Sequence, residues 1–234
     1  MVKRYCIYIC LMIICVCFSC KSIHSISQLP TDTYLIQPKD YQLFDTVSKV
    51  HQLVKMDIEQ ISDTTLMFTP ITEHSKPFIV NLWDIKQIKL HRNTFDVDIL
   101  TVPFKIRPSV RGFPEQLTAD FDAALYLGKR RDNYTIKNVK TRGNSKLQLT
   151  GAGYGYGGFI GLGSVAMNPY VTQNAIDYEY DGFVINGGFA GIYDAKKFNI
   201  GLAVGTDFLV DKNRSSWIYH GKPWIGVLFG IDLN

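Results

Sequence analysis

The sequence predicts an all-β protein: an antiparallel up-and-down β-barrel of six to eight strands, preceded by a small N-terminal β region. Three observations support this class. Bulky apolar residues alternate with small or polar residues after residue 92, which is the period of a half-buried strand. Seventeen of the 19 glycines follow residue 142, and many share a strand face with Asp, Asn or Ala. Short and long connections alternate between the predicted strands.

Composition and charge narrow the class of protein further. The 234 residues are 46% hydrophobic and 20% charged, which is typical of a globular chain rather than a disordered one. The net charge is only +4, and the chain has no long Lys/Arg run and no zinc-finger spacing. We therefore expect no nucleic-acid partner.

Residues 1–20 are predicted to be a lipoprotein-type signal peptide. Lys3 and Arg4 precede an apolar core over 6–18, which is too short for a comfortable membrane span. Ser19 then precedes Cys20, as in bacterial lipoprotein signals, so Cys20 is the predicted lipidation site. All five cysteines lie within the first 20 residues, and cleavage before Cys20 would leave a single thiol. Ordinary secretory cleavage, with the cysteines as small hydrophobes, is the alternative.

Two segments separate the signal from the predicted barrel. Residues 21–50 are a mixed polar stretch and are predicted to form a tether. Residues 51–92 contain short β-rich runs with a turn signal at Ser62-Asp63. They form either a small periplasmic β region or additional strands of the barrel, from "TTLMFTP" and "PFIVNLW" within 64–90.

Residues 93–234 are the predicted barrel. In the segment "TFDVDIL", Phe95, Val97 and Ile99 alternate with acidic residues, and the alternation shifts by one near Pro103, which predicts a β-bulge. Alternation and turn signals give six strands: about 95–107, 117–130, 147–164, 182–194, 197–210 and 223–233.

Alternation alone does not say which face of these strands is outside, but the glycines favour one answer. A soluble barrel turns its bulky apolar groups inward, whereas a membrane barrel turns them toward lipid. Glycines suit a crowded, curved interior better than a wet surface. We therefore expect Tyr154, Tyr156, Ile160 and Leu162 to face lipid and Phe159 to point inward, with an interior glycine face of Gly153, Gly155, Gly157, Gly161 and Gly163. A soluble glycine-rich strand that bends over a helix or a ligand is the alternative.

The connections fit a membrane topology. The short link at Ala195-Lys196 suits the periplasmic side, and the long polar links at 165–181 and 211–222 suit the external side. Counting back through the strands places 108–116 outside, 131–146 inside, and the N-terminal region in the periplasm. Four aromatic residues near the predicted strand ends are expected in interfacial belts: Tyr170, Trp217, Tyr219 and Trp224.

These segments carry a resemblance to a known class. The closing strand "KPWIGVLFGIDLN", the strands "GGFAGIYD" and "GLAVGTDFL", and the cysteine-terminated signal are similar to small outer-membrane β-barrel proteins of the Bacteroidota type. The resemblance covers about residues 95–234. It implies a fold and a location at the outer membrane, and it implies no catalytic residue.

Polar residues on the predicted inner face are expected to form a structural ion network, because charges inside a narrow barrel must be paired or hydrated. A polar path or a catalytic carboxylate cluster is the alternative. The predicted interior polar residues are Asp96, Asp98, Lys105, Arg107, Asp120, Asp122, Asp207 and Asp232.

The motifs favour a protein without enzymatic chemistry. The five histidines lack metal-ligand spacing, so no metal and no cofactor are expected. The predicted function is an outer-membrane-associated β-barrel lipoprotein with a structural or accessory role in the cell envelope. Its partners would be outer-membrane lipid and other envelope proteins. Two alternatives stay open: a lipid-anchored, soluble lipocalin-like barrel that binds an apolar ligand, and a lipid-modifying enzyme that uses His220 with Ser215 or Ser216.

Overall fold

The computed structural model describes residues 24–25, 28–43, 50–71, 76–110, 112–141, 144–194 and 199–232. Its elements are almost all strands, and all of the strand pairs are antiparallel, which confirms the all-β prediction. The predicted signal peptide over 1–20, and Cys20 with it, lies outside the described residues.

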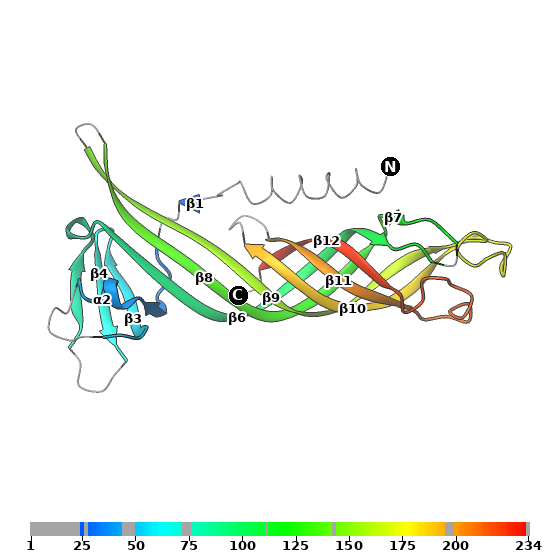
Figure 1. Cartoon of the computed structure of the whole chain (residues 1–234), viewed down its shortest axis with the longest axis horizontal. Coiled ribbons are helices and arrows are strands. Elements are labelled where there is room, and N and C mark those ends of the chain that lie inside the picture. Colours follow the sequence, from blue (N-terminus) through cyan, green and yellow to red (C-terminus); the bar gives the residue numbers. More distant parts are fainter. Residues whose placement is uncertain are drawn as a thin grey trace.

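Six strands form a ring (Figure 1). Each strand pairs with the next one along the chain, and the last strand pairs back with the first. The chain therefore runs up and down around the ring, as the alternation predicted. The strands are β6 (Gln87–Arg107), β8 (Asp122–Thr141), β9 (Asn144–Met167), β10 (Tyr180–Asp194), β11 (Asn199–Leu209) and β12 (Pro223–Asp232).

The strands of this ring are strongly tilted. A row of directly paired residues that starts at Asp96 on β6 passes around the ring and returns to β6 at Lys105, further along the same strand. Such a stagger requires strands inclined to the ring axis. The inner residues of this row on β8 to β12 are all small: Gly128, Gly157, Ala190, Ala203 and Gly226.

The bulge predicted near Pro103 is confirmed. The register between β12 and β6 shifts between Val227 and Phe229. On β6 the buried positions are even-numbered up to Val102 and odd-numbered from Lys105. The shift lets Lys105 and Arg107 point into the ring while Phe104 and Ile106 point out. β7 (Gln116–Thr118) pairs with this last part of β6.

A small sheet is attached to one end of the ring (Figure 1). Its strands are β2 (Asp32–Ile36), β3 (Val54–Ser62), β4 (Thr65–Pro70) and β5 (Phe78–Asn81), with the short helix α2 (Pro38–Tyr41) and a 3-10 turn at Leu82–Asp84. β2 pairs with β6 at Leu90 and His91, so the small sheet is continuous with the ring. β4 and β5 belong to this sheet and add no strand to the ring.

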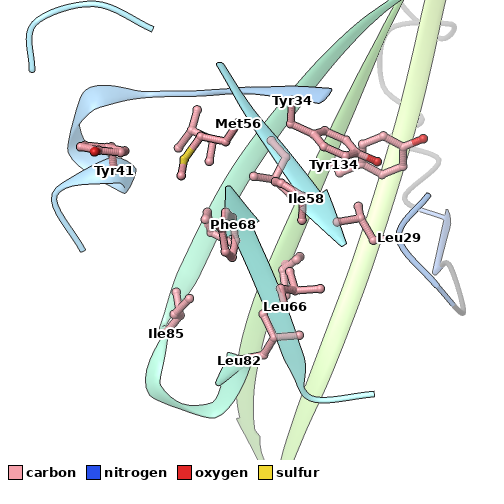
Figure 2. Packing of buried hydrophobic residues seen from close by; sticks show 14 residues of the cluster. Leu29, Tyr34, Tyr41, Met56, Ile58, Leu66, Phe68, Leu82, Ile85 and Tyr134 are labelled. Atoms are coloured by element: carbon pink, nitrogen blue, oxygen red, sulfur yellow. The ribbon is translucent and has the colours of Figure 1, made fainter. Parts of the chain in front are cut away.

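The small sheet has a conventional apolar core (Figure 2). Met56, Ile58 and Phe68 are buried together, and the Tyr34 ring meets the Tyr134 ring edge to face at 5.8 Å between centroids. Tyr134 belongs to β8, and Ile88 of β6 joins the same cluster, so the ring strands extend past the ring to support the sheet.

Two expectations from the sequence differ from these elements. Residues 32–41, within the predicted tether, form β2 and α2, because the side chains of Tyr34, Ile36 and Tyr41 are needed to close the apolar core. The predicted connection over 131–146 is largely strand, because β8 and β9 continue as a long hairpin paired from Arg131 to Asn144. The short strand β1 (His24–Ser25) pairs with this hairpin at Thr150 and Gly151.

Two loops, 168–179 and 210–222, lie together at the opposite end of the ring from the small sheet (Figure 1). They carry a second apolar cluster, in which Trp217, Ile218 and Tyr219 pack against Val165 and Met167 of β9. The Ile218 amide donates a hydrogen bond to the Val171 carbonyl, which joins the two loops. The loop end of the ring is therefore covered by ordered chain.

Candidate functional site

The interior of the ring is filled by a combination of very small and very large side chains. Gly205 lies where a Cβ atom would come within 2.6 Å of the Trp224 ring and 3.0 Å of the Phe159 ring. These two aromatic rings are 5.9 Å apart and belong to the buried interior cluster. The absence of a side chain at Gly205 thus makes room for Trp224, which is the reason for a glycine there rather than backbone freedom.

The glycines also let neighbouring strands approach closely. A Cβ atom at Gly157 would overlap the Leu127 carbonyl oxygen and the Gly128 backbone, and one at Gly188 would overlap the Val204 carbonyl oxygen. Gly153, Gly155, Gly161 and Gly163 are buried on the same inner face, whereas Tyr156 and Ile160 between them are exposed. The glycine face therefore lines the interior of the ring.

A buried ion cluster, the loop-end cluster, lies inside the ring near the two loops. It consists of Lys105, Arg107, Asp122 and Asp207. Lys105 Nζ lies 2.8 Å from Asp122 Oδ2 and 3.0 Å from Asp207 Oδ1. Arg107 Nη2 donates to Asp207 Oδ2, and Trp224 Nε1 donates to Asp207 Oδ1 at 2.8 Å. Two cations and two carboxylates thus balance one another in an almost fully buried site, where an unpaired charge would be very costly.

A second ion cluster, the sheet-end cluster, lies at the other end of the ring. Arg130 forms ion pairs with Asp96, Asp132 and Asp194. Arg92 then joins Asp132 at 2.7 Å to Asp32 at 3.2 Å, and Asp32 is the first residue of β2. Nearby, Asn199 donates to Asp98 at 2.8 Å. The sheet-end cluster therefore links the ring interior to the small sheet.

Most of the predicted interior polar residues are brought together in these clusters. Asp96, Asp98, Lys105, Arg107, Asp122 and Asp207 are buried, and Asp120 is half-buried beside the loop-end cluster. The side chain of Asp232 lies outside the described side chains. The structural role assigned to these residues stays a prediction.

Five members of the sheet-end cluster were not predicted from the sequence, among them Arg92 and Asp32. The other three are Arg130, Asp132 and Asp194, although Arg130 and Asp132 continue the even-numbered inner face of β8. Had the alternation been followed past residue 130, it would have placed both inside. Asp194 likewise continues the even-numbered inner face of β10, after Ala190 and Ile192.

The outer surface of the ring is apolar on all six strands. Exposed large residues occur on each strand, and Phe189 on β10 is 79% exposed. We call this surface the outer belt. It comprises Phe95, Ile99, Phe104, Ile106, Phe121, Leu125, Leu127, Tyr154, Tyr156, Ile160, Leu162, Phe183, Ile185, Phe189, Tyr193, Ile200, Leu202, Val204, Phe208, Val210, Ile225 and Phe229.

The outer belt ends at one level on three neighbouring strands. Phe95 on β6, Lys129 on β8 and Tyr156 on β9 are directly paired, and the next outward row is Asn93, Arg131 and Tyr154. Beyond this row, toward the small sheet, the outward residues of β8 and β9 are mostly polar, such as Lys137 and Gln148. A surface groove of about 530 Å³ runs along these two rows. We call this boundary the switch level.

Three aromatic residues that were predicted to lie in an interfacial belt are buried instead. Trp217 and Tyr219 pack in the loop cluster, and Trp224 fills the ring interior. Only Tyr170 of that set is exposed. The error arose because position near a strand end does not tell whether a side chain points inward or outward.

The hydrogen bond of the His220 ring is made with a backbone amide and not with Ser215 or Ser216. His220 Nδ1 accepts a hydrogen bond from the Leu209 amide at 3.2 Å, and its ring meets Phe208 edge to face. His220 therefore holds its own loop against β11.

Burial raises the pKa of the Tyr219 phenol above its ordinary value, so this group is a neutral hydroxyl.

Neither a metal-ligand cluster nor a long apolar helix occurs among the residues that the structure describes. In these ranges, no group of three or more His, Cys, Asp or Glu side chains is arranged to hold a metal ion. No helix in the described part of the chain is long and apolar enough to cross a membrane.

No protein-family model, no curated protein and no solved structure matches this chain.

Proposed function

We propose that this chain is a lipid-anchored β-barrel protein of the outer membrane, with a structural or accessory role in the cell envelope. In this proposal, lipid covers the outer belt and the small sheet lies in the periplasm. The observation that carries the proposal is the outer belt, which occurs on all six ring strands and ends at the switch level on β6, β8 and β9. Soluble proteins rarely expose contiguous apolar surface beyond a few hundred Å².

The dimensions of the outer belt support a membrane crossing. On β9 the belt runs from Tyr154 to Leu162, and on β10 from Phe183 to Tyr193. These runs are comparable with the roughly 9–11 residues that a tilted strand needs to cross the hydrocarbon. Lys129 and Arg131 with Tyr154 and Tyr156 at the switch level are the residue types found where a membrane meets water.

The packed interior supports a structural role rather than transport or ligand carriage. Trp224, Phe159 and Leu228 fill the same section of the ring in which a lipocalin-like barrel would keep its apolar ligand. The loop-end cluster closes the section above them with paired charges. A soluble barrel would also need the opposite facing, with Tyr156 inside and the glycines outside.

The ring has fewer strands than the eight of the smallest common bacterial barrels. A ring of six strands encloses less space, so its inner face needs small residues. The row of Gly128, Gly157, Ala190, Ala203 and Gly226 supplies them. The glycine content that first distinguished this sequence is thus accounted for by the small size of the ring.

Membrane extraction of the full-length protein tests the proposal. We expect the protein to stay in the membrane fraction after an alkaline carbonate wash and to be released by detergent. Leu202→Arg places a charge in the outer belt and should hinder insertion by about 2–4 kcal/mol if the residue lies near the midplane. Gln148→Arg is the matched control, because Gln148 is also exposed but lies on the polar side of the switch level. Release by carbonate, or equal assembly of both variants, would contradict the proposal.

The lipid anchor needs a separate test. We expect mass spectrometry of the mature protein to find an N-terminus at Cys20 with lipid on its sulfur. Cys20→Ser should abolish that modification and leave the strand ring able to assemble. A mature, unmodified N-terminus at another residue would exclude the anchor while leaving the barrel proposal intact.

A further inference from the structure

A small cavity lies at the loop end of the ring, between β7, the end of β9 and the two loops. Its volume is about 150 Å³, and its lining includes Arg107, Gln116, Asp120, Tyr170 and Tyr219. This is about five times the ~30 Å³ that one water occupies in the liquid. It is also smaller than the roughly 300–1,000 Å³ of sites for drug-sized ligands. The cavity therefore suits one small polar molecule rather than a lipid or a peptide.

Two buried polar groups in this cavity have unused hydrogen-bonding capacity. Arg107 is buried, and its Nη2 is paired with Asp207, but its Nη1 has no hydrogen-bond partner among the described residues. The buried Tyr219 hydroxyl likewise has no partner there. More than about 90% of buried polar groups in proteins are hydrogen-bonded. Two such groups in one cavity therefore indicate a bound molecule that completes their hydrogen bonds.

The charges around the cavity favour a neutral molecule over an anion. The positive charges of Lys105 and Arg107 are already balanced by Asp122 and Asp207. Asp120 adds a further carboxyl group to the lining. Arg107 and Tyr219 can donate hydrogen bonds, Asp120 can accept them, and the Gln116 amide can do both. A molecule with several hydroxyl groups matches this mixture of donors and acceptors.

An aromatic ring at the rim completes the site. Tyr170 is 51% exposed, and its ring is held edge to face by Phe113, with 4.6 Å between the centroids. The Arg107 guanidinium is itself held over the Trp217 ring at 5.2 Å and the Tyr219 ring at 5.5 Å. The polar groups of the site are thus fixed in place, and Tyr170 offers an apolar face at the opening.

We propose that this cavity binds one neutral sugar ring, whose hydroxyls pair with Arg107, Tyr219 and Asp120 and whose apolar C–H face packs on Tyr170. The proposal depends only on the loop end of the ring and not on whether lipid covers the outer belt.

The test is a titration of the purified full-length protein with each candidate ligand. Binding is measured by saturation-transfer NMR of the ligand signals. The probes are D-glucose, D-galactose, D-mannose and N-acetyl-D-glucosamine, with inorganic phosphate and acetate as anion probes at constant ionic strength. The detergent must have no sugar headgroup, because such a headgroup would compete for the site. A protein that is soluble by itself is titrated without detergent. We expect saturable binding of at least one sugar, with a Kd of roughly millimolar, and no saturable binding of either anion.

Two variants locate the site and identify the chemistry of its ligand. Tyr170→Ala should weaken sugar binding at least tenfold, whereas Tyr178→Ala should leave it unchanged, because Tyr178 is 45% exposed in the same loop but does not line the cavity. Asp120→Asn should weaken the binding of a hydroxylated ligand, which loses a carboxylate acceptor, and would strengthen the binding of an anion.

Four results would overturn the proposal. They are saturable binding of phosphate or acetate without sugar, tighter binding in Asp120→Asn, equal effects of Tyr170→Ala and Tyr178→Ala, and no saturable binding of any probe to the wild-type protein, which would leave water as the only occupant. If a variant does not fold, the titration of the wild-type protein alone decides whether the cavity binds a sugar.

Discussion

Apolar and polar residues alternate in the strands of both the small sheet and the strand ring, but the apolar face points inward in the small sheet and outward in the ring. In the small sheet, apolar side chains such as Met56 and Phe68 face inward and polar ones face water. In the ring, Asp207 and glycines face inward, whereas Phe189 and Leu202 face outward. A strand pattern therefore specifies two faces without specifying which of them is the core.

Strand β6 passes through both regions and shows the change within one element. Up to Val102 its even-numbered residues point inward, from Ile88 and Leu90 in the small-sheet core to Asp96 and Asp98 inside the ring. The backbone does not turn over between these pairs. Only the chemistry of the two faces is exchanged, at the switch level. This places the cause of the exchange in the surroundings of each region, water around the sheet and, in our proposal, lipid around the ring.

The two regions also differ in what stabilises their interiors. The small sheet buries bulky apolar side chains, whose transfer from water stabilises by about 25 cal/mol per Å². The ring interior holds small residues and paired charges, so it gains less from burial and depends more on closure of the backbone hydrogen-bond ring and on complete pairing of the charges. Substitutions should therefore act by different physical mechanisms in the two regions.

The largest effect is expected for Asp207→Asn in the loop-end cluster. Asp207 accepts from Lys105, Arg107 and Trp224, and loss of its charge leaves two buried cations with one carboxylate. Breaking a buried ion pair from one side costs about 3–5 kcal/mol. The measurement is urea unfolding of the purified protein, followed by tryptophan fluorescence. Asp181→Asn, at an exposed position of β10, is the control and should change stability by less than about 0.5 kcal/mol. Equal midpoints for the two variants would show that the interior charges are not essential to the ring.

An intermediate effect is expected for Gly157→Leu on the inner face of β9. The added side chain would overlap the Leu127 carbonyl and the Gly128 backbone, and overpacking typically costs about 1–3 kcal/mol. Tyr156→Leu, one residue away on the outer belt, should be tolerated, because leucine also suits an apolar surrounding. The folded fraction is measured from gel mobility of unheated and heated samples. The reverse order would mean that the tyrosine side of β9 is the core.

The smallest effect is expected in the small sheet for Tyr34→Phe. The ring of Tyr34 keeps its contact with Tyr134, but its hydroxyl no longer donates to the Pro30 carbonyl at 2.5 Å. Loss of one such hydrogen bond costs about 0.5–1.5 kcal/mol. Limited proteolysis should detect faster cleavage near residues 28–36. The gel mobility of the unheated protein, which reports the folded ring, should stay the same. A change in ring mobility would indicate that the two regions unfold together.

Much of the ring could be predicted from local pattern. The six ring strands, the bulge near Pro103 and the inward direction of Phe159 follow from period-two alternation and from one shift in it. The extension of β8 past residue 130 was missed because its many polar residues resemble a loop, although the period-two pattern continues there through Asp132, Tyr134 and Ile136. The burial of Trp217 and Tyr219 was missed for a similar reason, since both lie in a loop without alternation.

The sequence was sufficient to locate the six ring strands, their two faces and their small inward residues, because these depend on neighbours along the chain. The tertiary structure decided how many strands close the ring, which separate charges meet and where the polarity of the surface changes. Arg130 reaches Asp194 only because β8, β9 and β10 are adjacent in one register, and Arg107 meets Tyr219 only because a loop folds over the end of the ring. Contacts of this kind join residues far apart in the chain, so their geometry exists only once the ring has closed.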